Sequence, residues 1–151
     1  MTLVYIMSFI AVCGGGGKTT ICNKYPEKFL DIDTFIWSKN NEEYHEKLID
    51  AINKTETDKI GEIYKTILNE KRDKIDKNKI ILGHHPKNAK WLNLNCLFII
   101  KPNKELHEKN IANRDYKLQK IARTCWSNLT NAIIYNSYTE FEDLLLASYT
   151  I

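Results

Sequence analysis

A run of four glycines is the feature that most restricts how this chain can fold. Residues 12–20 read VCGGGGKTT and follow the apolar run 3–11 directly. Glycine has no Cβ atom, so such a loop can turn tightly and point successive N–H groups into one concavity that holds phosphate. The string misses the phosphate-binding pattern G-x-x-x-x-G-K-[ST] at one position, because Val12 stands where the first glycine belongs. We therefore predict a buried strand, a phosphate-binding loop and a helix, in that order.

Each residue of this loop has an expected role. The glycine N–H groups and the Lys18 ammonium would hold the β- and γ-phosphates of a nucleotide, and the Thr19 hydroxyl would ligate Mg²⁺. Gly14 and Gly15 would take over the tight turn that the first glycine makes in the standard pattern. A flexible turn between strand and helix is the alternative. The predicted cofactor-binding residues are Gly14, Gly15, Gly16, Gly17, Lys18, Thr19 and Thr20.

Short apolar runs alternate with amphipathic segments along the whole chain. These runs are apolar nearly throughout, as in parallel strands that are covered on both faces. The expected strands are 3–11, 29–32, 80–82, 96–100 and 132–135. The expected helices are 17–25, 41–53, 57–75, 104–114, 118–129 and a C-terminal helix that begins with a capping box of Thr139 and Glu142. The alternation predicts a single α/β domain over residues 1–151 with a five-stranded parallel sheet.

Two acidic residues follow the second predicted strand, at the edge of the sheet where ligands bind. Asp31 and Asp33 are two residues apart, so their side chains would share one face of a strand. Beside a phosphate site, a carboxylate would hold Mg²⁺ or accept a proton from a substrate hydroxyl. We expect Asp33, which lies nearer the rim, to hold Mg²⁺ and to accept the proton. We expect Asp31 and Asp33 both to contact the acceptor. The alternative is an acidic strand end that caps a turn.

Three ring side chains are further candidates for the acceptor site. His84 and His85 end the third predicted strand, before Pro86, and would bond to the acceptor or serve as a general base. Trp37 follows Asp33 closely and would line the acceptor pocket. The alternatives are a polar turn for the histidines and packing for the tryptophan.

Arginine is scarce, which makes each arginine easier to interpret. Only Arg72, Arg114 and Arg123 occur among the 22 basic residues. A planar guanidinium suits bidentate contact with phosphate. Arg114 and Arg123 follow the fourth predicted strand, and we expect them to neutralise charge on a transferred phosphoryl group. Solvated helix residues are the alternative.

The composition is that of an ordinary globular domain. A formal charge of +3, with lysines scattered among acids, gives no indication of nucleic-acid binding. The four cysteines lack CxxC spacing, which predicts reduced thiols and no zinc. The apolar N-terminal run is too short for a bilayer, so no membrane is expected as a partner. The many Asn, Ile and Lys residues indicate an AT-rich genome, such as that of a virus or phage, and we expect a cytoplasmic location, or the virion of a virus.

The order of the motifs resembles that of small P-loop kinases. GGGGKTT, FLDIDTFIW, IILGHHP, LFIIKPNKELHEKNIANRD and QKIARTCW follow one another as in the nucleoside-monophosphate-kinase-like group, which includes shikimate and gluconate kinases. The resemblance implies a three-layer P-loop NTPase fold, ATP or another nucleoside triphosphate with Mg²⁺, and acids after the second strand that meet the acceptor. It also implies an acceptor-side helical segment at 38–78 and a short lid at 112–118, with Arg114 and Arg123 on the transferred phosphate.

Three functions follow from these observations. The first is ATP-dependent transfer of phosphate to a nucleotide or similar small acceptor. Its catalytic residues would be Lys18, Asp33, Arg114 and Arg123. The second is a nucleotide-binding structural or regulatory protein with little turnover and an unidentified protein partner, because Val12 departs from the pattern and no acid ends the strand 80–82. The third is a 5′-polynucleotide kinase, which would need a basic channel.

Overall fold

Five strands form one parallel sheet in the computed structural model, which describes residues 8–76 and 78–149. The strands are β1 (Ser8–Val12), β2 (Phe29–Asp31), β3 (Ile80–Gly83), β4 (Asn95–Pro102) and β5 (Ile133–Tyr135). Their order in the sheet is β2-β3-β1-β4-β5, and each neighbouring pair is parallel. The predicted α/β class and five-stranded parallel sheet are confirmed. The part of the first predicted strand before residue 8 lies outside the described residues.

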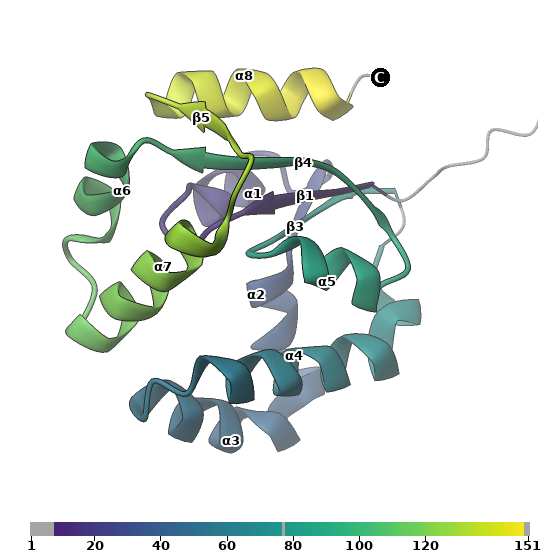
Figure 1. The fold of residues 1–151 in the computed structure, drawn as a ribbon. Helices are drawn as coiled ribbons and strands as arrows, with labels where there is room; N and C mark the ends of the chain where they lie inside the picture. The colour runs from purple at the N-terminus through teal and green to yellow at the C-terminus, as the bar shows by residue number, and fades with distance from the viewer. Residues whose placement is uncertain (1–7, 77, 150–151) are drawn as a thin grey trace, which may run out of the picture.

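Helices connect the strands and cover both faces of the sheet. The helical elements are α1 (Lys18–Lys24), α2 (Ile32–Ile36), the 3₁₀ turn η1 (Lys39–Asn41), α3 (Glu42–Asn53), α4 (Thr57–Lys71), the 3₁₀ turn η2 (Arg72–Lys74), α5 (Pro86–Trp91), α6 (Lys104–Ile111), α7 (Tyr116–Asn128) and α8 (Tyr138–Tyr149). Figure 1 shows α8 above the sheet and α3 and α4 below it. Among the described residues, no helix combines the length and hydropathy needed to cross a bilayer.

The central strand β1 supplies side chains to two separate apolar clusters. Phe9 and Ala11 face α2, α3, α4 and α5, whereas Ile10 and Val12 face α1 and α8. All four side chains are fully buried. This alternation follows from the period of two in a strand, and it explains why the run is apolar throughout rather than at every second position. The carboxyl end of β1 is therefore anchored on both sides, and the glycine loop starts from a fixed point.

The second strand ends earlier than its sequence suggests. Residues 32–36 form α2, and Asp31 is its N-cap, because the Asp31 carboxylate accepts a hydrogen bond of 2.9 Å from the Asp33 N–H. Asp33 thus lies in the first turn of a helix. The expectation that the two acids share a strand face is wrong, and the reading of Asp31 as a capping acid is confirmed.

The helix α5 follows β3 directly. This helix was not predicted from the sequence. His85 is the N-cap, and its Nδ1 accepts a hydrogen bond of 3.1 Å from the Lys87 N–H. The Asn88 side chain accepts one of 3.2 Å from the His85 N–H, and Pro86 occupies the first helical position, which its fixed φ favours. The polar turn, which was the alternative interpretation of the two histidines, describes the backbone at His85, and acceptor contact of either ring stays a prediction.

The last helix begins with different capping residues from those predicted. The Ser137 hydroxyl accepts from the Glu140 N–H at 3.2 Å, and the Glu140 carboxylate accepts from the Asn136 N–H at 2.8 Å. Glu142 instead pairs with Lys24 on α1 at 2.8 Å. The capping box is therefore two positions earlier than expected, and Glu142 is free to tie α8 to α1.

Candidate functional site

The glycine loop turns back sharply between β1 and α1. The Gly16 N–H donates to the Cys13 carbonyl at 3.0 Å, which closes a tight turn over residues 13–16. Gly15 (φ 83°) and Gly17 (φ 104°) adopt positive φ values that side chains disfavour. Gly14 and Gly15 are the two central residues of the turn, as predicted, and of these two Gly15 has the positive φ. Alternating backbone conformations of this kind form anion-binding concavities.

Three side chains from distant parts of the chain bind the loop carbonyls. His107 Nε2 lies 2.8 Å from the Gly14 oxygen, and Asn110 Nδ2 donates to the Gly15 oxygen at 2.9 Å. The Tyr135 hydroxyl donates to the Gly16 oxygen. The carbonyl groups are thereby directed toward α6 and β5, and the N–H groups of Gly15 and Gly17 make no hydrogen bond within the described residues. The loop is held in a form that presents donors.

None of these three anchors was predicted from the sequence. His107 and Asn110 are three positions apart on α6, so they lie on one helical face, and that spacing is the only local signal. Tyr135 ends β5 and is 1% exposed. Its partner on the loop is 119 positions away, which no local pattern reveals.

Lys18 is buried and points back toward the strand. Its ammonium donates to the Val12 carbonyl at 3.0 Å and lies 3.4 Å from the Asp33 carboxylate, and the side chain is 5% exposed. Burial alone would lower the pKa of Lys18, but the Asp33 and Asp31 carboxylates raise it above the ordinary value. The ammonium is therefore charged at neutral pH.

Asp33 binds partners from three elements. Besides Lys18 on α1, its carboxylate accepts a hydrogen bond of 2.8 Å from the Tyr64 hydroxyl on α4 and lies 3.8 Å from His84 Nδ1 after β3. Burial raises the pKa of Asp33, but Lys18, His84 and Tyr64 outweigh it and lower that pKa to about 2. The Asp33 side chain remains 37% exposed and so is accessible to a ligand.

Asp31 has the opposite electrostatic environment. Burial, and then repulsion from Asp33, raise the pKa of Asp31 to about 6, while Lys18 and the Thr19 hydroxyl act against this shift. Two neighbouring carboxylates thus differ widely in acidity, which is typical of sites where acids have separate tasks.

The loop and both acids line one cavity of about 290 Å³. Every predicted cofactor-binding residue from Gly14 to Thr20 contributes to its lining. Asn110, Arg114 and Tyr138 form further walls, and the Tyr138 hydroxyl is buried with no hydrogen-bond partner among the described residues. The cavity therefore combines a glycine loop, a buried lysine, two carboxylates and an arginine.

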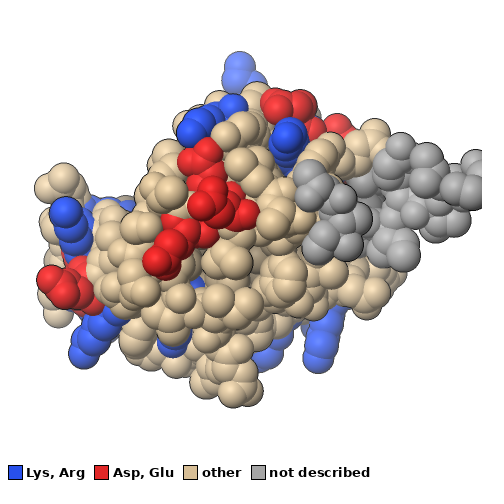
Figure 2. Space-filling model, turned by 90° about the horizontal axis from the view of Figure 1, so that it is seen from above, with Lys and Arg blue, Asp and Glu red and all other residues tan. Residues whose placement is uncertain are grey.

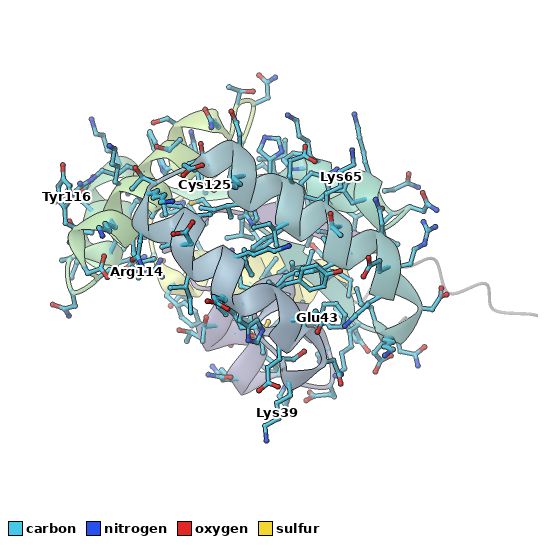
Figure 3. All side chains as sticks on the ribbon, turned by 90° about the horizontal axis from the view of Figure 1, so that it is seen from below. Lys39, Glu43, Lys65, Arg114, Tyr116 and Cys125 are labelled. Atoms are coloured by element: carbon cyan, nitrogen blue, oxygen red, sulfur yellow. The ribbon has the colours of Figure 1, made fainter. Side chains whose placement is uncertain are left out.

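The two candidate arginines have different surroundings. Arg114 lines the cavity from the turn between α6 and α7, at the side of the molecule where Figure 3 labels it. Arg123 is outside the cavity lining and forms a two-pronged ion pair with Glu108, at 2.8 Å for both contacts. Of the segment 112–118, which the resemblance implies to be a short lid, residues 116–118 belong to α7, and its role as a lid stays a prediction. Gln119 fixes the remaining turn by donating to the carbonyls of Ile111, Ala112 and Arg114 at 3.0–3.3 Å.

Only one of the three ring candidates contacts the acids. His84 approaches Asp33, and burial lowers the pKa of His84 to about 4, so its ring is neutral at physiological pH. His85 caps α5. Trp37 packs against the His45 ring at 5.1 Å between centroids and does not line the cavity of the glycine loop, and its contact with an acceptor stays a prediction.

The oxygen donors beside the loop fit a magnesium ion shared with phosphate. Mg²⁺ in nucleotide sites takes one or two protein oxygens and completes its shell with phosphates and water. Thr19 and Asp31 are neighbours at the cavity, whereas Asp33, the predicted ligand, is engaged by Lys18 and Tyr64. The described part of the chain holds no group of three or more His, Cys, Asp or Glu residues that could bind a metal ion by themselves, at this site or at any other.

The sequence matches no protein-family model and no curated protein.

Proposed function

We propose that this chain binds a nucleoside triphosphate with Mg²⁺ at the glycine loop and transfers the terminal phosphoryl group to a small acceptor. The observation that carries the proposal is the single cavity in which the whole loop meets Lys18, Asp31, Asp33 and Arg114. A loop with pinned carbonyls and free N–H groups suits phosphate, and the parallel sheet with β1 at its centre is compatible with a three-layer P-loop NTPase fold.

Lys18 would move from Asp33 to the phosphates when the nucleotide binds. The ammonium cannot keep both its present contacts and a close contact with β- and γ-oxygens. Because Lys18 is the strongest of the groups that lower the pKa of Asp33, its departure would raise that pKa. Asp33 would thereby become a better acceptor for a substrate proton at the moment when the phosphate arrives. Phosphoryl transfer needs mainly positioning and charge stabilisation, so a modest rise is sufficient.

Each remaining group at the site has a role in this proposal. The Thr19 hydroxyl and the Asp31 carboxylate would hold the Mg²⁺ ion, whose charge neutralises the β- and γ-oxygens. The Arg114 guanidinium would contact the transferred group, for which its planar fork is suited. Arg123 receives no role, since its ion pair with Glu108 occupies it.

The test compares Lys18→Ala with Lys90→Ala, a substitution at an exposed lysine of α5. We expect MgATP to raise the melting temperature of the wild type and of Lys90→Ala, but not of Lys18→Ala. We expect ADP release by the first two proteins to depend on an added acceptor from a panel of nucleosides, nucleotides and sugars. Acceptor-dependent ADP release that survives Lys18→Ala would overturn the mechanism.

A nucleotide-binding protein without turnover is the second candidate. It is favoured by one contact, the hydrogen bond of 3.0 Å that holds Lys18 on the Val12 carbonyl, away from a phosphate. Stabilisation by MgATP with no ADP formed for any acceptor would select this function.

The polynucleotide kinase has less support. Figure 2 shows a band of acidic side chains on the upper face of the molecule, with separate basic side chains around it and no continuous basic groove on that face.

A further inference from the structure

A second cavity of about 350 Å³ lies next to the nucleotide cavity. Its walls come from the start of α4, from the residues that follow β3 and from α7, where Cys125 is labelled in Figure 3. Its volume is at the lower end of the range of about 300–1,000 Å³ for small-molecule sites. Gly61 and Trp91 are among the residues that line it.

The contact between Asp33 and His84 lies between the two cavities. Asp33 lines the first and His84 lines the second, and their side chains are 3.8 Å apart. Lys18, beside the glycine loop, lies 3.4 Å from the same carboxylate. A hydroxyl that reached Asp33 from the second cavity would therefore be next to the terminal phosphate.

One feature of the second cavity is unexplained by protein packing. Gly61 is inside α4, where glycine is a poorer helix former than alanine, yet a Cβ at this position would meet no atom within 4 Å. The glycine therefore leaves open space on the side of α4 that lines the cavity.

The charged groups around this cavity restrict the ligand. Asp58 and Glu62 are acidic, Lys87 is the single basic residue of the lining, and no arginine contributes. Both lining histidines are neutral at physiological pH, because burial lowers the pKa of each of them. The lining thus carries an excess of negative charge, which repels an anion.

We infer that the second cavity binds the phosphate acceptor, and that this acceptor is an uncharged or cationic compound with hydroxyl groups, such as a nucleoside, a sugar or an amino sugar, rather than a phosphorylated one. The inference rests on the proposed phosphotransfer. In the reaction, the acceptor oxygen bonds to the γ-phosphorus while the bond from that phosphorus to the bridging oxygen breaks. ADP leaves with the electron pair, and the hydroxyl proton passes to Asp33.

The experiment measures binding to the full chain without nucleotide, so that it does not depend on turnover. Matched pairs of probes are titrated by calorimetry: nucleosides, hexoses and amino sugars, each against its own phosphate ester. We expect at least one unphosphorylated probe to bind, and its ester to bind at least tenfold more weakly. Esters that bind more tightly than their parent compounds, or no binding by any probe at millimolar concentration, would overturn the inference.

Two variants of α4 locate the bound probe. Gly61→Leu fills the cavity and is expected to weaken binding at least tenfold while raising the melting temperature, because leucine is a better helix former. Thr66→Leu adds bulk on another side of the same helix, outside the lining, and is expected to leave binding within twofold. Equal effects of the two variants would contradict the assignment.

A third variant tests the charge argument. Asp58→Asn combined with Glu62→Gln should reduce the preference for the unphosphorylated probe at least threefold, and an unchanged preference would refute the role of these acids. If unphosphorylated probes bind more tightly than their esters but no ADP is released, the inferred binding site stands and the proposed phosphoryl transfer fails. Failure of the acceptor site can therefore be distinguished from failure of the proposed function.

Discussion

Val12 and Gly16 are packed so closely that a Cβ on residue 16 would collide with the Val12 Cγ1 atom. The same Cβ would lie 2.8 Å from the Cys13 carbonyl oxygen. The Val12 side chain, at the position of the first glycine of the pattern, is fully buried. It fits because Gly16 has no Cβ atom in the space that the Val12 side chain fills. The departure at Val12 is therefore accommodated inside the loop.

Restoring the missing glycine should cost stability and leave nucleotide binding nearly unchanged. Val12→Gly removes a fully buried side chain, and we expect the free energy of unfolding to fall by about 2–4 kcal/mol. Nucleotide affinity, measured by calorimetry well below the melting temperature, should change less than threefold, because the loop already has its turn. Tenfold tighter binding would show instead that Val12 distorts the loop.

Gly16→Ala should abolish nucleotide binding. The added methyl group cannot be placed without shifting the backbone of Cys13, so the turn opens. Gly61→Ala is the matched control, since its Cβ meets nothing, and it should stabilise the protein. Thermal denaturation with and without MgATP measures both effects.

Arg114 and Arg123 should respond differently to the same conservative change. Arg114→Lys keeps the charge but loses the planar fork, and we expect phosphoryl transfer to fall by about tenfold to a hundredfold. Arg123→Lys removes the two-pronged geometry of an exposed pair with Glu108, and it should change transfer less than twofold and leave the melting temperature nearly unchanged. Equal losses of activity would contradict the placement of Arg123 outside the site.

The two acids predict how stability depends on pH. Asp31 has a pKa of about 6 in the fold against an ordinary 3.8, so the folded state binds the proton of Asp31 more tightly than the unfolded state does. The free energy of unfolding therefore falls as the pH rises from 3.8 to about 6. Asp33 has a pKa of about 2 in the fold against an ordinary 3.8, so its ionised carboxylate stabilises the fold at pH values above 3.8. This contribution is lost as the pH falls from 3.8 toward 2.

Replacing Asp31 isolates its contribution. Asp31→Asn can still cap α2, and at pH 8 it should be more stable than the wild type by about 1–3 kcal/mol. The difference should disappear near pH 4, as urea denaturation at several pH values would reveal. Asp50→Asn, at an exposed position of α3, serves as the control and should show no such convergence. A stability difference that grows toward acid pH would refute the direction of the Asp31 shift.

Tyr135→Phe tests the anchoring of the loop. The change leaves the buried Gly16 carbonyl without its donor, so we expect a loss of about 1–3 kcal/mol in the free energy of unfolding and weaker nucleotide binding. Tyr44→Phe removes an exposed hydrogen bond of 2.7 Å to Glu70 and should cost less than about 0.5 kcal/mol. A Tyr135→Phe protein with unchanged nucleotide affinity would show that the anchor does not shape the site.

The strands and the glycine loop could be predicted because their signals are local. Continuous apolar runs identified every strand core in the described residues, and the glycine run identified the turn. The helix α2 was missed because Ile32, Phe35 and Ile36 suit a strand, whereas the competing signal is a single cap by Asp31. In a short segment with such mixed preferences, one hydrogen bond and the surrounding packing determine whether a helix or a strand forms.

Most of the cavity was predicted, but its internal connections were not. Lys18, Thr19, Asp31, Asp33 and Arg114 line it together. The link from Asp33 to Tyr64 and the position of Arg123 depend on where α4, α6 and α7 pack. Those positions are set by tertiary contacts that a single sequence does not display.

The anchors of the glycine loop also determine when the site can exist during synthesis. The loop is made early, but His107 is 93 positions and Tyr135 is 119 positions further along the chain. Until these residues have left the ribosome, the loop carbonyls have no partners and the turn has nothing to hold it. A truncated chain that ends before β5 would lack the Tyr135 hydroxyl that holds the Gly16 carbonyl, so the folding of β5 onto the sheet is a precondition for the finished loop.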